Sequence, residues 1–279
     1  MREGLVSYLS TRMRQLLLEA YAAAYMGYKV YFRYPMTILS DVVTTPLWTI
    51  IFLVPILLFL PREQWSNPIT YEFFYWGMIF WDIVSMALWG IGSVVRSEQQ
   101  LGTIEYLFLS NANRVVMFLS RVATRVLTLM LDACYFAAAI YLLFGVWVRV
   151  VNPFLLILVM LLSLYAAVGF GTLYAALVLK LKSPGALSNI LQFVIMGLSG
   201  VFFPVSRLPE QVRPAAYVLP FSYGVDLVRA AAIGTETMLS LPAEILVLAV
   251  YGLLLNAAGL LVLKHIEASS KRTGKLGAY

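Results

Sequence analysis

The chain has 279 residues, of which 61% are hydrophobic and only 12% are charged, and its mean hydropathy is +0.84. Soluble domains are about 25% charged, so this composition excludes intrinsic disorder and an ordinary soluble enzyme. The net charge of +6 comes from basic residues between apolar runs, which is typical of membrane orientation rather than nucleic-acid binding. A single Cys134 and a single His265 exclude an intramolecular disulfide and a metal site built on Cys or His clusters.

The N-terminal residues 1–34 are expected to lie in the cytoplasm. Residues 8–30 place Leu9, Met13 and Leu16 near one helix face, which predicts an interfacial helix lying along the membrane. A cytosolic helix without membrane contact is the alternative. No compact apolar core is followed by a small-residue cleavage site, so we expect no cleavable signal peptide.

Six apolar runs follow, each long enough to cross most or all of the roughly 30 Å hydrocarbon core as a helix. Backbone amides find no water there, so each run is expected to be helical, and the continuous pattern differs from that of a membrane barrel. The predicted spans are residues 35–60, 73–95, 126–148, 154–179, 186–203 and 241–263. The fold class is therefore all-α integral membrane, with a six-span domain over residues 35–263 and a basic tail over residues 264–279.

The distribution of Lys and Arg sets the expected orientation. With a cytoplasmic N-terminus, fifteen of the twenty basic residues lie on the inner side and five on the outer side. The positive-inside rule then places both termini in the cytoplasm, which agrees with an even number of spans. We expect a multi-pass protein of the cell membrane, whose basic tail contacts anionic lipid headgroups.

The loop between the second and third spans contains the signal of a short helix. Thr103 can cap a helix that begins near Ile104, and Glu105 is favourably placed in the first turn. Leu107 and Phe108 then form an apolar patch on a cytoplasmic loop. This patch fits a groove on a partner protein or, alternatively, dips into the lipid interface.

The same loop resembles the signature of permease subunits in type-2 ATP-binding-cassette (ABC) exporters. The resemblance implies a coupling helix that docks into a groove of a cytosolic ATPase, with Gly102 permitting a tight turn before it. The residues that carry it are Glu98, Gly102, Thr103, Ile104, Glu105, Leu107 and Phe108. The acidic Glu98 and Glu105 would suit a basic groove on that partner.

A second stretch, after the fifth span, resembles the extracellular re-entrant element of the same family. The resemblance implies two short helices that enter the outer leaflet and return as an outer gate, with prolines setting their ends. An ordinary external loop is the alternative. The residues concerned are Gly200, Pro204, Leu208, Pro209, Leu219, Pro220 and Arg229.

The resemblance also implies the partners. Two ATPase copies would bind the ATP and Mg²⁺, while this chain carries no cofactor and no catalytic site. The sequence agrees, because it contains no Gly-x-x-x-x-Gly-Lys-[Ser/Thr] phosphate loop. Six spans are half of the usual path in this family, so a second permease is expected, forming a homodimer in contact with membrane lipids.

Two aspartates lie within the predicted spans, where ionisable side chains are costly and often functional. Asp82 lies near the middle of the second span and Asp132 lies in the third. One hypothesis is that they line the substrate path and favour a cationic cargo. The alternative is an interhelical pair or a backbone contact that holds the spans together.

The leading functional hypothesis is therefore the permease of an ATP-driven exporter for a lipophilic or amphiphilic substrate, such as a drug or a lipid. A polysaccharide or glycolipid exporter with an aromatic-lined channel is the alternative. An ion-coupled secondary transporter is less well supported, because no inverted repeat is visible. A membrane enzyme is disfavoured, because one His, one Cys and scattered Asp residues supply no catalytic pairing.

Overall fold

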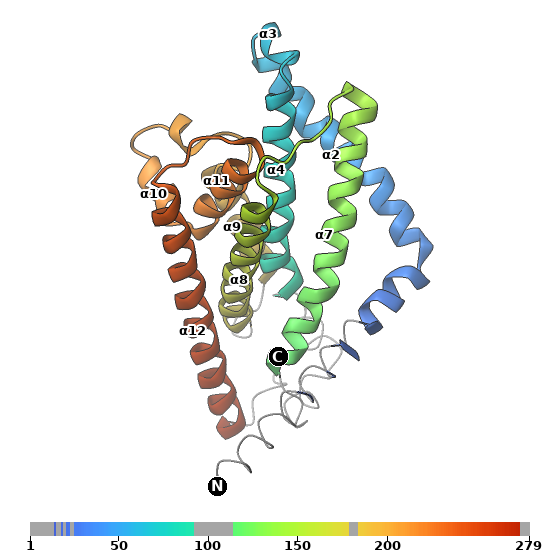
Figure 1. The fold of residues 1–279 in the computed structure, drawn as a ribbon. Helices are drawn as coiled ribbons and strands as arrows, with labels where there is room; N and C mark the ends of the chain where they lie inside the picture. The colour runs from blue at the N-terminus through green and yellow to red at the C-terminus, as the bar shows by residue number, and fades with distance from the viewer. Residues whose placement is uncertain are drawn as a thin grey trace.

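The structure, a computed structural model, describes residues 25–91, 114–178 and 184–273, together with residues 14, 18, 21 and 22. Within these ranges the regular elements are helices and none is a strand (Figure 1). Five of the helices contain apolar stretches long enough to cross a membrane, which confirms an all-helical membrane fold. These helices are α2 (Pro35–Phe59), α4 (Pro68–Ser85), α7 (Arg114–Phe144), α8 (Pro153–Val178) and α12 (Leu241–Thr273).

Three predicted spans agree closely with the structure, namely the first (α2), the fourth (α8) and the sixth, which α12 extends. The second span begins earlier than predicted, at Pro68, because the Asn67 side chain accepts the Ile69 amide at 3.0 Å and caps the helix. Proline in the first helical turn loses no hydrogen bond, which fixes this start. The helix then continues into a π-helical turn, η1 (Met86–Ile91).

Two predicted spans are wrong at their C-terminal ends. The third was expected to reach residue 148, but α7 ends at Phe144 because Gly145 adopts a φ of 70°. The fifth was expected over residues 186–203, but α9 covers only Pro184–Leu198. Its 15 residues rise about 22 Å, less than the hydrocarbon thickness, so the described residues contain five helices long enough to span and one short apolar helix.

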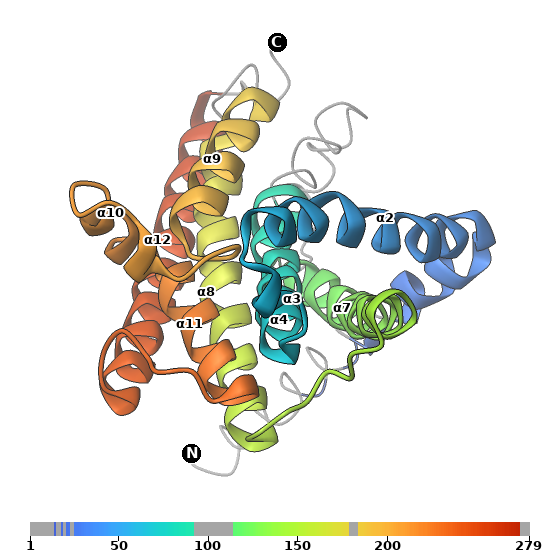
Figure 2. The same cartoon turned by 90° about the horizontal axis from the view of Figure 1, so that it is seen from above.

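Short helices follow α9 and lie with α3 (Arg62–Trp65) toward one end of the bundle (Figure 1). They are η2 (Val205–Arg207), α10 (Arg213–Tyr217) and α11 (Pro220–Ile233). Seen along the bundle, α4 lies between a pair formed by α2 and α7 and a group formed by α8, α9 and α12 (Figure 2). Helix α11 packs against α4, α8 and α12, so it is held by most of the bundle.

The most extensive helix pair is α8 with α12, and it depends on a close approach at Gly169. A Cβ atom at this position would lie 2.6 Å from the backbone nitrogen of Asn256. The Asn256 side chain donates to the carbonyl of Tyr165 at 2.8 Å, which joins the two helices by a hydrogen bond. Small residues and interhelical hydrogen bonds of this kind drive helix association in lipid.

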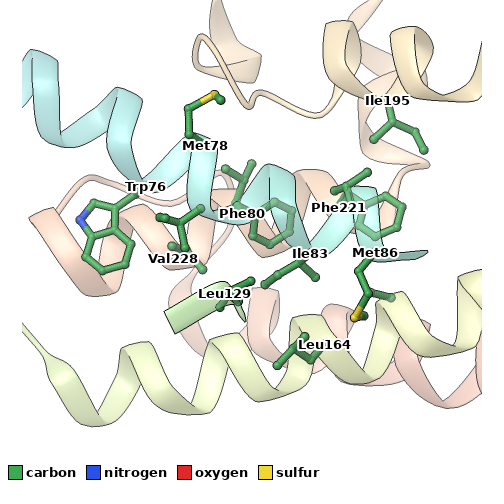
Figure 3. Close-up of a cluster of buried hydrophobic side chains, with 14 of the residues drawn as sticks. Trp76, Met78, Phe80, Ile83, Met86, Leu129, Leu164, Ile195, Phe221 and Val228 are labelled. Carbon is green, nitrogen blue, oxygen red and sulfur yellow. The ribbon is translucent and has the colours of Figure 1, made fainter. Parts of the chain in front are cut away.

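The apolar core lies where α4, α8 and α11 meet. Phe80 of α4 is fully buried, and Phe221 of α11 is 1% exposed beside it (Figure 3). Ile83 and Leu164 extend the same cluster toward α8. Helix α11 is therefore an integrated part of the core and not a loop resting on the surface.

Candidate functional site

A cavity of about 440 Å³ opens between α2, α4, α7 and α9. Its volume falls within the range of small-molecule sites, roughly 300–1,000 Å³. Four kinds of side chain form its wall. They are the carboxylates Asp41, Asp82 and Asp132, the aromatic rings Trp48, Phe52, Trp81, Phe136, Phe193 and Phe202, the polar residues Thr44, Thr45, Ser85 and Gln192, and the methionines Met78 and Met196.

The structure brings together both aspartates that the sequence singled out. Asp82 from α4 and Asp132 from α7 line the same cavity, as the path hypothesis requires. Sequence reasoning did not assign Asp41 to this group, although the same signal, a lone charge within an apolar span, identifies it. Among the described residues, no three Asp, Glu, His or Cys lie close enough to hold a metal ion.

Asp41 also connects the cavity to the helical residues 25–33 that precede α2. The hydroxyl of Tyr31 donates to Asp41 Oδ2 at 2.8 Å. Burial, reinforced by this bond, raises the pKa of the Tyr31 hydroxyl, so it remains a neutral donor at physiological pH. The bond fixes the position of one of the three carboxylates at the cavity wall.

Three of the aromatic residues at the cavity wall form a stacked series. Trp48 stacks on Phe52 with ring centroids 5.3 Å apart, and Phe52 stacks on Phe202 at 5.0 Å. This series runs from α2 to the turn after α9. Aromatic stacks combine large apolar area with little conformational freedom, so the wall offers a rigid flat surface to a ligand.

At the other candidate site, Arg229 joins α11 to α4 and to the turn after α9. Its side chain is 2% exposed, and Nε donates to the carbonyl of Phe73 at 3.1 Å. Its two terminal nitrogens donate to the carbonyls of Gly200 and Val201. Burial lowers the pKa of the guanidinium to about 9, so Arg229 stays protonated at neutral pH. Its Cζ lies 3.4 Å from the centroid of the Phe73 ring, a cation–π contact.

A glycine on α4 makes this arrangement possible. A Cβ atom at Gly77 would lie 2.1 Å from the carbonyl oxygen of Val201 and 2.6 Å from the Arg229 guanidinium. Both distances are far below van der Waals contact. The turn after α9 therefore lies directly against the α4 backbone, and Arg229 holds it there.

Most of the other residues predicted for the outer gate lie at the ends of the short helices and in the turns between them. Pro204 and Leu208 flank η2, and the carbonyl of Pro209 accepts the amides of Val212 and Arg213. Leu219 precedes Pro220, which begins α11. Of the predicted residues, Gly200 is the one that bonds to Arg229, and its φ of 83° lets the chain turn toward the guanidinium.

A pair of acidic residues near this element was missed by sequence reasoning. Asp226 of α11 accepts the Met238 amide at 2.7 Å, and the fully buried Glu244 of α12 accepts the Leu239 amide at 3.3 Å. Both residues are unremarkable in sequence, because Asp226 lies outside the predicted spans and Glu244 lies at the start of one. Only the packing of α11 on α12 shows that they are neighbours.

The predicted coupling residues lie outside the described residues. They are Glu98, Gly102, Thr103, Ile104, Glu105, Leu107 and Phe108. Their role as an ATPase-docking helix therefore stays a prediction.

Comparison with known proteins adds a family and two relatives. The family described as ABC-2 type transporter matches residues 20–233. The capsule polysaccharide export inner-membrane protein CtrC of Neisseria meningitidis serogroup B is 29% identical over 93 residues, which cover 33% of this chain and 35% of the relative. CtrC of serogroup A is 33% identical over 89 residues, which cover 32% and 34%. These matches span about a third of the relatives' length.

Proposed function

Because the chain belongs to the ABC-2 type transporter membrane family, we propose that it is the permease of an exporter for a carbohydrate-bearing amphiphile, a polysaccharide or a glycolipid. ABC-2 permeases are multi-pass membrane components of ATP-driven transporters and pair with ATPase subunits. The sequence alone favoured a drug or lipid cargo. The capsule polysaccharide export relatives favour the polysaccharide alternative instead.

The observation that carries this proposal is the mixed wall of the cavity. Sugar rings have apolar C–H faces and a rim of hydroxyl groups. The stacked surface of Trp48, Phe52 and Phe202 suits the faces, and Trp81 lines the same space. Ionised carboxylates accept several hydrogen bonds each, so Asp41, Asp82 and Asp132 suit the hydroxyl rim.

A cationic amphiphile is the second candidate, because the same three carboxylates would attract positive charge. The two candidates differ in what they require of Asp82 and Asp132. An amide accepts and donates hydrogen bonds but carries no charge, so Asn at these positions retains contacts to sugar hydroxyls. A cation loses its charge partner and binds much more weakly.

The test is ligand-stimulated ATP hydrolysis by the complex of this chain with its ATPase, reconstituted in lipid nanodiscs. A glycolipid and a cationic amphiphile are compared on the wild type, the double variant Asp82→Asn/Asp132→Asn and the exposed-carboxylate control Glu63→Gln. The carbohydrate proposal expects glycolipid stimulation that changes less than about threefold in the double variant. Stimulation by the cationic amphiphile alone, lost in the double variant, would overturn it in favour of the second candidate.

The family also supports a proposal for energy transfer. Two ATPase copies bind ATP and Mg²⁺, and the segment from Glu98 to Phe108 docks on them as the coupling helix, with the termini in the cytoplasm. A second copy of the permease completes the path as a homodimer. Reversing the charge of Glu105 (Glu105→Arg) is expected to dissociate or uncouple the ATPase, measured by co-purification and ATP turnover. Unchanged co-purification and turnover would remove this role from the loop.

For the outer element, we propose that α10 and α11 form a re-entrant gate at the outer mouth of the path. The burial of α11 against α4, α8 and α12 supports this reading over a surface loop. Cysteine substitutions along α11 should react slowly with a membrane-impermeant reagent added from outside. Rapid and uniform labelling would favour the external loop.

A further inference from the structure

Asp226 and Glu244 form a buried carboxyl pair that lies outside the transport cavity. Each accepts one backbone amide, from Met238 and Leu239 respectively, in the loop that joins α11 to α12. The two carboxyl groups are neighbours, because the amides that they accept belong to consecutive residues. Glu244 is 0% exposed, and no hydrogen-bond donor of the described part of the chain reaches its Oε1 atom.

This geometry favours a bound proton. Ionised carboxylates are acceptors only, so two buried neighbours repel each other, whereas a protonated carboxyl supplies one donor that the other can accept. Two like charges in one buried site also disfavour ionisation of both groups. A shared proton leaves a single negative charge, which the positive charge of Arg229, three residues after Asp226 on α11, offsets.

We propose that Asp226 and Glu244 are a proton-binding site, and that the bound proton holds α11 against the first turn of α12. Loss of the proton leaves two negative charges facing each other beside one positive charge. The repulsion pushes α12 and the connecting loop away from α11, which also carries the Arg229 contacts to Gly200 and Val201. The pair is thus a pH-sensitive latch on the outer element, and it is independent of the nature of the cargo.

The neighbouring groups do not replace the proton. On α11, Arg229 provides a positive charge near the pair, and Tyr223 is a neutral phenol beside Glu244. Tyr251 of α12 lies near Tyr223, and Glu236 of the loop is exposed. Of the other helices packed against α11, α8 carries no ionised side chain over Pro153–Val178, and on α10 Arg213 donates to the carbonyls of Ser206 and Leu208. On α4, Glu72 accepts the Arg149 amide and Asp82 lines the cavity.

The sign of the pH effect follows from burial. The folded protein binds the proton more tightly than the unfolded chain, so the contribution of the pair to stability is complete at low pH and is lost as the pH rises through its titration. Glu244→Gln keeps the neutral hydrogen-bonding form at every pH. This variant should therefore be at least as stable as the wild type at neutral pH and should lack its pH dependence.

The test uses the full chain in lipid nanodiscs, with infrared spectroscopy and thermal unfolding from about pH 5 to about pH 9. The wild type should show a carbonyl stretching band of a buried protonated carboxyl that disappears at high pH, and Tm should fall by roughly 3–5 °C per pH unit across this titration. Both effects should be absent in Glu244→Gln and in Asp226→Asn, and unchanged in the exposed control Glu236→Gln.

Any of the following outcomes would overturn the proposal. A wild type without the band, or a band that persists in both variants, would show that the pair holds no proton. An equal fall of Tm with pH in the wild type and Glu244→Gln would show that the proton does not latch the helices. Failure of Glu244→Gln to fold would also contradict it, because glutamine preserves the neutral form.

Discussion

Replacing Arg229 by methionine tests whether one buried cation holds α11 and the turn after α9 against α4. Methionine fills a similar length of apolar space but donates no hydrogen bond. The substitution leaves the carbonyls of Gly200 and Val201 without the donors that they have in the structure, and leaves Asp226 without its nearest positive charge.

The magnitude follows from these losses. A buried carbonyl left without a donor costs about 1–3 kcal/mol, so Gly200 and Val201 together cost about 2–6 kcal/mol. Breaking a buried charge arrangement by removing one partner costs about 3–5 kcal/mol. The two estimates describe the same contacts and agree, so we expect a loss of about 3–5 kcal/mol, or a fall in Tm of roughly 6–20 °C.

The assay is thermal unfolding in nanodiscs combined with limited proteolysis of the segment from Ser199 to Pro209. Arg207→Met is the matched control, because Arg207 is exposed on the same element and its loss should cost less than about 0.5 kcal/mol. Arg229→Met should melt earlier and be cut faster in this segment. Equal melting and cleavage of the two variants would refute the view that Arg229 holds the turn against α4.

Three further predictions follow from close contacts. Gly169→Ala should destabilise the chain by more than about 2 kcal/mol, because its Cβ would overlap the Asn256 backbone. The control Gly197→Ala, whose Cβ would have no atom within 4 Å, should be neutral or stabilising. Equal melting of the two variants would contradict the close approach of α8 and α12. Gly77→Ala should expose the segment after α9 to protease as Arg229→Met does, and a wild-type cleavage rate would argue against that packing. Tyr31→Phe should cost about 1 kcal/mol and raise the substrate concentration needed for half-maximal ATPase stimulation; an unchanged response would show that Asp41 needs no positioning.

The spans could be predicted from the sequence because hydropathy and length alone decide whether a segment crosses lipid. The errors lie where one local residue ends a helix inside an apolar run. Gly145 and Gly200 both adopt positive φ just beyond the ends of α7 and α9, while the neighbouring side chains remain apolar. A hydropathy average does not register a single turn, so both spans were drawn too long.

The sites depend on packing between distant segments, which the sequence does not contain. Asp82 and Asp132 were identifiable one at a time as intramembrane charges, but their convergence with Asp41 requires the arrangement of α2, α4 and α7. Likewise, Arg229 was singled out through a family motif, yet its contact with Phe73 spans 156 residues of chain. Such partners become visible only once the helices are placed together.

The most direct test of the central claim is ATP-driven transport itself. Inside-out vesicles containing the complete transporter are supplied with a fluorescent glycolipid and ATP, and uptake is compared for the wild type, Trp81→Ala in the cavity and Trp65→Ala on α3. The account predicts ATP-dependent uptake in the wild type and the Trp65 variant, and at least a tenfold loss in the Trp81 variant, about 1.4 kcal/mol of binding. Uptake unaffected by Trp81→Ala, or absent from the wild type, would contradict a carbohydrate path through this cavity.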